Sequence, residues 1–145
     1  MHFIAPPPPK KLRVPTITLR QLVDAVILYL PTITNYAHSW ERMTVEREDK
    51  LTCVSLNSRD LPGVVPTPVV RLYVHGKVAQ SMTSKLWSEP FLITIYVQRT
   101  IRLVVEPRAD KSIAIHEIIS WEGDRPIWKT TDGTSQSGLV NQSAL

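Results

Sequence analysis

Residues 90–107 read PFLITIYVQRTIRLVVEP, and this stretch decides the fold. A proline stands at each end, and mostly apolar residues lie between them. Eighteen residues are too many for one ordinary strand. The stretch therefore predicts either a hairpin that turns near Gln98–Arg99 or one long, bent strand.

Apolar and polar residues alternate on both sides of this stretch, with the period of two that is typical of strands. The alternation is clear in RLYVHGK (residues 71–77) and in SIAIHEIISW (residues 112–121), whose Ile113, Ile115, Ile119 and Trp121 are expected on one side. Strands are predicted at 50–57, 69–82, 112–121 and 127–131, with a long proline-containing loop at 58–68.

A helix is predicted upstream, in TLRQLVDAVILYLP (residues 18–31). Its apolar residues recur at the spacing of one helix face, which we expect to pack on a sheet. Thr18 and Gln21 form a T-x-x-Q capping box at the start. Pro31 is expected to end the helix.

The order of these elements indicates an α+β fold. A second short helix is indicated at 36–43 by the helical spacing of Tyr36, Trp40 and Met43, with a charged loop at 44–50. The prediction is a single antiparallel, or mostly antiparallel, sheet of five or six strands packed by one or two N-terminal helices. We expect a flexible proline-rich basic arm at 1–17, one domain at 18–131 and a disordered tail at 132–145.

The net charge of +4 is unevenly distributed. The first 20 residues contain Lys10, Lys11, Arg13 and Arg20 and no acid, and the remaining 13 basic residues are matched by 13 acidic ones. A neutral body argues against a broad basic binding face. The four basic residues are candidates for contact with an anionic membrane or a nucleic acid, and the alternative is a solvated tail.

The arm also contains a run of four prolines, Pro6, Pro7, Pro8 and Pro9. Proline fixes φ and lacks an N–H, so this run favours extended polyproline II. The P-x-x-P spacing beside a lysine makes a proline-binding host domain of the SH3 or WW type a candidate partner.

No residue pattern indicates an enzyme, a metal site or a cofactor. The four histidines are scattered, and Cys53, the only cysteine, lies in an apolar run where a thiolate is disfavoured. We therefore expect no catalysis and no cofactor. The N-terminus lacks the apolar run of a signal peptide, so we do not expect secretion.

Two strands combine aromatic and basic residues, as an RNA-reading sheet does on its exposed face. They are RLYVHGK, with Tyr73 between Arg71 and Lys77, and IYVQRTIR, with Tyr96 near Arg99 and Arg102. The solvated side of an ordinary sheet gives the same pattern. Trp87, beside a proline-containing connection, is the tryptophan that we expect to be an exposed contact.

The order of features resembles the matrix proteins of rhabdoviruses, over roughly residues 15–121. The proline-rich N-terminus and the amphipathic helix precede YAHSWERM, RLYVHGKVAQSM and PFLITIYVQRTIRLVVEPRADKS. That family has a proline-rich basic arm before a small domain with one sheet packed by helices. The chain departs from the family in its short length, and APPPPKK lacks the tyrosine of PPxY and the order of PTAP.

The resemblance implies a non-enzymatic viral structural protein, which self-associates and bridges membrane and ribonucleoprotein during virion assembly. Its implied partners are itself as a homo-oligomer, an anionic membrane surface, and the viral nucleocapsid or RNA. Its implied location is the virion and the host cytoplasm, peripheral to the membrane. The alternative is a small basic nucleic-acid-binding viral accessory protein.

Overall fold

The structure is a computed structural model, and it describes residues 16–33, 40–58, 70–97, 99–130, 134–137 and 140–141. Within these residues one helix precedes eight strands, so the fold is α+β with mostly β structure. The elements are α1 (Leu19–Ile33), β1 (Trp40–Glu48), β2 (Leu51–Ser58), β3 (Val70–His75), β4 (Phe91–Tyr96), β5 (Thr100–Pro107), β6 (Ile113–Glu122), β7 (Arg125–Lys129) and β8 (Ser135–Ser137).

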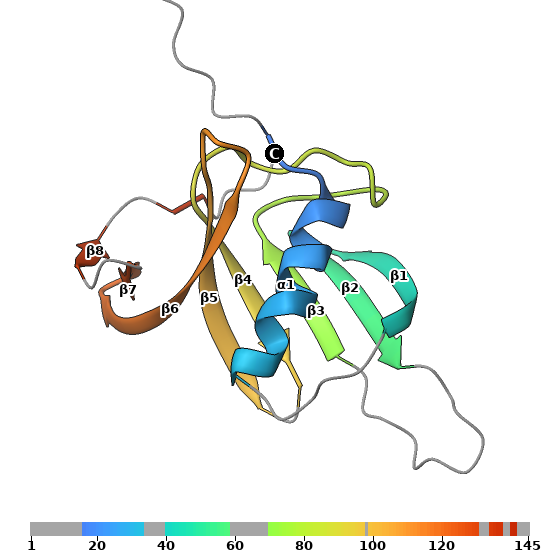
Figure 1. The fold of residues 1–145 in the computed structure, drawn as a ribbon, viewed down its shortest axis with the longest axis horizontal. Coiled ribbons are helices and arrows are strands. Elements are labelled where there is room, and N and C mark those ends of the chain that lie inside the picture. The colour runs from blue at the N-terminus through green and yellow to red at the C-terminus, as the bar shows by residue number, and fades with distance from the viewer. Residues whose placement is uncertain are drawn as a thin grey trace, which may run out of the picture.

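The strands form one antiparallel sheet in which each strand pairs with the next along the chain, and α1 lies across one face of it (Figure 1). The expected α+β class and the single antiparallel sheet are therefore confirmed. The hairpin near Gln98–Arg99 is confirmed as well, because β4 and β5 pair up to Tyr96 and Thr100. The expected five or six strands are wrong, since the sheet has eight.

β1 is the main departure from the sequence prediction, which had a helix through residue 43 and a charged loop after it. Residues 40–48 instead form one arm of a hairpin with β2, closed by a turn at Asp49 and Lys50. Asp49 has a positive φ of 51°, which a short polar side chain tolerates. Val45 pairs with Val54 and packs against the main core, so tertiary pairing overrides the helical spacing.

The folded body extends beyond the expected limits of 18 and 131. Ile17 is 3% exposed, and its carbonyl accepts a 2.7 Å hydrogen bond from the Leu86 N–H. In the region expected to be a tail, β8 pairs with β7, and the Asn141 N–H donates to the Pro90 carbonyl at 3.1 Å. Ile17 and Asn141 are hydrogen-bonded to the connection before β4, which is distant from both in the chain, and β8 is paired with β7; local composition does not report either contact.

The predicted helix begins with the predicted capping box. The Thr18 N–H donates to Gln21 Oε1 at 2.8 Å, and the Gln21 N–H donates to Thr18 Oγ1 at 3.2 Å. The expected stop at Pro31 is wrong, because α1 continues to Ile33. A proline in the last turn removes one backbone hydrogen bond, and this cost is small where the helix is about to end.

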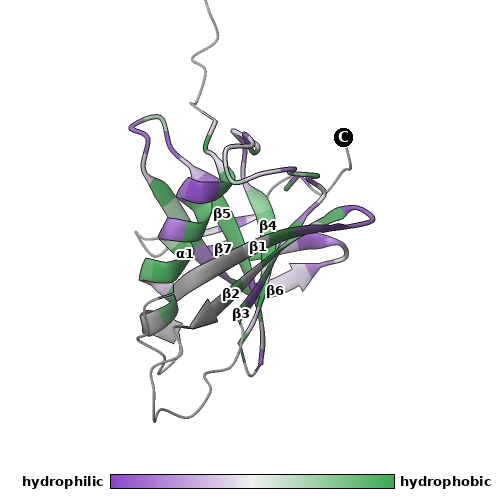
Figure 2. Ribbon diagram, turned by 90° about the vertical axis from the view of Figure 1, so that its right-hand side faces the viewer, coloured by the Kyte–Doolittle hydropathy of each residue, from purple (hydrophilic) through white to green (hydrophobic). Residues whose placement is uncertain are grey.

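The main core lies between α1 and the facing side of the sheet, and hydrophobic residues accordingly line α1, β4 and β5 (Figure 2). A second, smaller core lies on the opposite side of the sheet, where Trp128 of β7 packs with Leu92 and Val104. Of the described residues, only Ile118 and Val140 pack against this second core in addition, so it occupies part of that side of the sheet.

Candidate nucleic-acid interface

On the side of the sheet away from α1, the part that no described helix or strand covers is an aromatic and cationic surface that we call the open face. We define it by six residues: Arg71, Tyr73 and His75 on β3, Tyr96 on β4, Arg102 on β5 and Trp121 on β6.

Strand register brings the first five of these residues to one side. In β3 the alternate residues Leu72 and Val74 are fully buried against α1, so their neighbours Arg71, Tyr73 and His75 point the other way. Across the sheet, Arg71 stands opposite Tyr96, Tyr73 opposite Thr94, and Thr94 opposite Arg102. Residues that are directly opposite in a sheet share a face, so β3, β4 and β5 contribute to one surface.

A β-bulge in β6 brings Trp121 to the same surface. By simple alternation Trp121 belongs with Ile113 and Ile115, which is where the sequence analysis placed it. The register shifts between Ile118 and Ser120, so Trp121 pairs with Pro126 while Ile118 pairs with Trp128. Pro126 and Trp128 are two residues apart and share a face, so Trp121 lies on the side of Ile118, away from α1. Its expected place beside the half-buried isoleucines is wrong.

The aromatic rings of the open face are positioned by their neighbours and accessible to solvent. Tyr73 and Tyr96 contact each other edge to face, with ring centroids 5.3 Å apart and an interplanar angle of 86°. The Arg102 guanidinium lies 5.9 Å from the Trp121 ring centroid, a cation–π distance. Tyr96 is 44% exposed and Trp121 is 41% exposed. Both rings therefore offer surface to a ligand.

The charge of the open face at neutral pH comes from its arginines. Burial and then the positive charge of Arg102 lower the pKa of His75 below its usual value, and His75 Nε2 lies 2.5 Å from Thr94 Oγ1. A hydrogen bond with Cys53, and then burial, raise the pKa of Tyr73. His75 and Tyr73 are thus neutral at pH 7, while Arg71 and Arg102 are exposed cations.

This combination can bind an unpaired base together with its phosphate. Nucleobases stack on exposed aromatic rings, and arginines beside the rings contact the phosphate backbone. The sheet holds these groups on paired strands, so a ligand does not have to order them on binding. Glu46 and Glu48 of β1 are exposed acidic residues on the same side of the sheet, and the charge of Glu48 contributes to the raised pKa of Tyr73.

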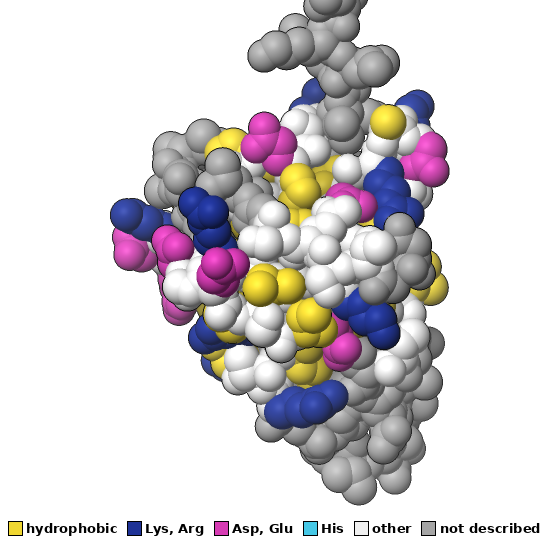
Figure 3. Space-filling view, turned by 90° about the vertical axis from the view of Figure 1, so that its left-hand side faces the viewer, with side chains coloured by type: hydrophobic (Ala, Val, Ile, Leu, Met, Phe, Trp, Pro, Cys, Tyr) yellow, Lys and Arg dark blue, Asp and Glu magenta, His cyan; other side chains and the backbone are white. Residues whose placement is uncertain are grey.

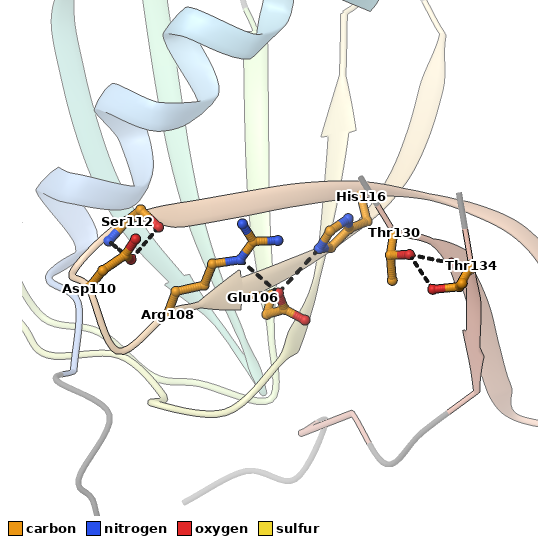
Figure 4. Close-up of polar contacts among 7 residues, drawn as sticks. All are labelled: Glu106, Arg108, Asp110, Ser112, His116, Thr130 and Thr134. Atoms are coloured by element: carbon orange, nitrogen blue, oxygen red, sulfur yellow. Dashed lines mark hydrogen bonds and ion pairs between the residues drawn. The ribbon is translucent and has the colours of Figure 1, made fainter. Parts of the chain in front are cut away.

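Next to the second core is another polar cluster, formed by the β5–β6 hairpin and β7 (Figure 4). His116 is buried, with Nε2 3.6 Å from Glu106 Oε1, and the Arg108 Nε–H donates to the same oxygen at 3.0 Å. Thr130 donates to the Thr134 carbonyl. Nε2 of His116 has no hydrogen-bond partner, and in the described part of the chain no three His, Cys, Asp or Glu side chains converge as a metal site. The cluster joins the β5–β6 turn to the sheet.

The surface over β6, β7 and β8 differs from the open face. It shows acidic and basic side chains intermixed, with only small hydrophobic areas between them (Figure 3). A mixed surface of this kind gives no single-sign field that would attract a polyanion.

Most of the predicted contact residues fall outside the described part of the chain: Lys10, Lys11, Arg13, Pro6, Pro7, Pro8 and Pro9. Arg20 is described, and it lies on α1 with its Nε 3.2 Å from Asp24 Oδ1, so it belongs to the body and not to the arm.

Trp87 is less accessible than we expected. It is half-buried against the main core, its Nε1 is buried without a hydrogen-bond partner, and the Lys77 ammonium lies 4.5 Å from its ring centroid. Trp87 is therefore a packed residue at the end of the sheet, and a contact role for it stays a prediction.

Four of the six residues of the open face, Arg71, Tyr73, Tyr96 and Arg102, belong to the aromatic and basic pattern seen in the sequence, whereas His75 and Trp121 were not predicted as contacts. The aromatic and basic pattern of β3 and β4 was visible in the sequence, but the pattern does not tell which side of the sheet is covered. The doubled isoleucine at Ile118 and Ile119, which breaks the alternation of β6, was the available signal for the bulge.

The comparisons with known proteins give no relative: no family model, no curated protein and no solved structure matches the chain. In the part of the chain that the structure describes, no helix has the length and hydropathy needed to cross a membrane.

Proposed function

We propose that this chain binds single-stranded nucleic acid on the open face and acts without catalysis. The observation that carries the proposal is that the exposed ring of Trp121 lies beside the guanidinium of Arg102, on the same side of the sheet as the exposed ring of Tyr96. Aromatic rings accept any unpaired base, and a duplex hides its bases from them. We therefore expect a preference for single strands with little dependence on sequence.

The test is a binding titration of the full chain with a fluorescent oligonucleotide of about 12 nucleotides, as single-stranded RNA, single-stranded DNA and duplex. Trp121→Ala and Tyr96→Ala each remove one stacking surface. Each is expected to lose about 1–3 kcal/mol of binding free energy.

The matched control is Leu28→Ala. Leu28 is 79% exposed on α1, on the other side of the molecule, so its truncation removes exposed apolar surface without touching the open face. Equal affinity of Trp121→Ala, Tyr96→Ala and the unchanged chain would contradict the proposal, as would a preference for duplex.

A matrix-like role, with self-association and attachment to an anionic membrane through the basic arm, stays a prediction from the resemblance. Its basic residues Lys10, Lys11 and Arg13 lie outside the described part of the chain. Nucleic-acid binding by the open face is compatible with that role, since a matrix protein also contacts a nucleocapsid, and it equally supports the alternative of a nucleic-acid-binding accessory protein.

A further inference from the structure

We propose that the binding of single-stranded nucleic acid on the open face is coupled to the uptake of one proton by His75, so that affinity rises as the pH falls. This inference rests on the proposed function and adds its regulation. Arginine keeps its charge throughout the physiological range of pH, whereas histidine gains or loses its charge within that range. His75 is therefore a third cation of the open face that forms only under some conditions.

The position of His75 places its charge on the surface that the ligand contacts. His75 is half-buried and lies on the same side of β3 as Arg71. Its Nε2 is 2.5 Å from Oγ1 of Thr94 on β4, and Thr94 stands opposite Arg102 on β5. Neighbouring strands are about 4.8 Å apart, so the backbone of Arg102 lies about 10 Å from that of His75. This separation is about one Debye length at 0.1 M salt, so each residue responds to charge at the other.

The charged residues of the open face oppose the protonation of His75, because both of them are arginines. The two strands that pair with β3, which are β2 and β4, contain no charged residue. Lys77, two residues after His75, has its ammonium over the Trp87 ring at 4.5 Å from the centroid. Burial first, and then the charge of Arg102, lower the pKa of His75. The ring is therefore neutral at pH 7 when no ligand is bound.

The acidic side chains on this side of the sheet do not offset burial and the arginine charge. Glu48 of β1 stands opposite Leu51, and Leu51 stands opposite His75, so Glu48 is on the same side but two strands away. Asp49 lies in the turn between β1 and β2, next to the cation Lys50. Because the pKa of His75 is lowered and not raised, these carboxylates leave the ring without an effective counter-ion.

A bound phosphate supplies the missing negative charge. Phosphate oxygens that contact Arg71 and Arg102 lie on the side of the sheet that carries His75. An opposite charge favours the protonated ring, so binding raises the pKa of His75. A ligand that raises the pKa of a group binds the protonated form more tightly, by the same factor. Affinity therefore increases as the pH falls from the pKa of His75 in the complex to its lower pKa in the free chain.

The first test is a titration of the full chain with an oligouridylate of about 12 nucleotides, at low salt and at several pH values between about 5 and 8. Uracil does not titrate in this range, so the bases cannot produce the effect. One proton limits the rise of affinity to about tenfold per pH unit. Between pH 8 and pH 5 the affinity of the unchanged chain should rise at least about threefold more than that of His75→Gln. Near-ultraviolet circular dichroism at each pH establishes that both chains are folded.

The matched control is Arg71→Gln, which removes a fixed charge from the same strand. It should bind more weakly than the unchanged chain at every pH and still show the rise at low pH, because His75 is retained. Leu28→Ala, on α1, should follow the unchanged chain throughout. The other three histidines are present in every variant, so their titration cancels in the comparison.

Two further measurements detect the proton itself. Calorimetric titration near pH 6.5, in two buffers of different ionisation enthalpy, gives the number of protons that the complex takes from the buffer. This number should lie between zero and one for the unchanged chain and for Arg71→Gln, and it should be smaller for His75→Gln. Nitrogen NMR of the histidine rings needs no variant, and the titration midpoint of His75 should move to higher pH when the oligouridylate is added.

The outcomes separate this proposal from the binding proposal. An unchanged chain that binds without proton uptake, a His75→Gln chain that takes up as many protons, or a His75 midpoint that does not move on saturation would overturn the coupling alone. Nucleic-acid binding would still stand in each of these cases. A chain that binds the oligouridylate at no pH would overturn both proposals.

Discussion

His75 is the residue of the open face whose charge changes most readily with pH. Its pKa is lowered first by burial and then by Arg102, so the folded state favours the neutral ring. The unfolded chain takes up this proton at a higher pH than the folded chain does. The stability that His75 contributes is therefore fully present above its ordinary pKa near 6.5 and is lost as the pH falls through the folded value.

We expect His75→Gln to reduce the rise in unfolding free energy between about pH 5 and pH 7.5. Urea denaturation at several pH values measures this slope for the variant and the unchanged chain, and groups common to both cancel in the difference. Arg102→Gln is the companion variant. It should reduce the slope less than His75→Gln does, because burial is the larger cause of the lowered pKa. An unchanged slope in His75→Gln would contradict the assignment.

Single residues also explain why the two tryptophans of the last strands differ. Trp128 is 3% exposed and is the centre of the second core, whereas Trp121, seven residues earlier, is 41% exposed beside Arg102. The bulge between Ile118 and Ser120 brings Trp121 to the same side of the sheet as Trp128, but Trp121 lies outside the second core. The exposure of a tryptophan in this region can therefore be predicted only when the strand register is known.

At the scale of the element, α1 is held at its start by two kinds of contact. The capping box of Thr18 and Gln21 is local. The connection before β4 supplies the rest, since the Leu19 and Arg20 N–H groups donate to the Ser84 and Met82 carbonyls, each at 2.9 Å. Helix N-termini leave such N–H groups unpaired, so each contact satisfies a group that would otherwise need water.

We expect Thr18→Ala to lower the free energy of unfolding by about 0.5–2 kcal/mol, the usual cost of losing an N-cap. Gln21→Ala should cost less, and the double variant should cost less than the two single costs added, because both variants break the same reciprocal pair. Chemical denaturation of the four chains gives this cycle, with Leu28→Ala as the exposed helical control. Simple additivity would mean that the two side chains act separately.

The strands also show which elements of the sheet a sequence pattern can predict. The six strands from β2 to β7 follow an apolar period of two or a proline-bounded run, and they were predicted near their observed places. β1 and β8 were not, since β1 is rich in charge and β8 reads SQS. Both are held by backbone hydrogen bonds to a neighbouring strand. Such bonds do not require particular side chains, so the sequence pattern does not indicate them.

At the scale of the whole molecule, a neutral body with an open face is joined to a basic arm. The two parts predict different salt dependences. Contacts of lysine and arginine with phosphates release counterions and are weakened steeply by salt, whereas stacking on aromatic rings is not an ionic contact.

We therefore expect deletion of residues 1–13 to reduce the slope of log affinity against log salt for single-stranded RNA, by about one unit or less per basic residue removed. Trp121→Ala should instead lower affinity by a similar factor at every salt concentration. The deletion stops before Ile17, because Ile17 is part of the core. The same deletion tests the membrane prediction, and it should abolish sedimentation with vesicles rich in phosphatidylserine.

An arm deletion that leaves both the salt slope and the vesicle binding unchanged would show that the arm contacts neither kind of anion. The control is replacement of Pro6–Pro9 by alanine, which keeps Lys10, Lys11 and Arg13. That variant should retain both the salt slope and the vesicle binding if the positive charge of the arm causes them.

The sequence by itself determined the α+β class, the capped helix, most strands of the sheet and the concentration of positive charge in the first 20 residues. These features depend on local periodicity and composition, which any stretch of the chain displays without its neighbours. The tertiary structure alone decided that Tyr73, Tyr96, Arg102 and Trp121 share one surface of the sheet, and that β1 pairs with β2 alone among the described strands. The physical reason is that strand register, the bulge in β6 and the choice of the face that α1 covers are all set by contacts between residues far apart in the chain.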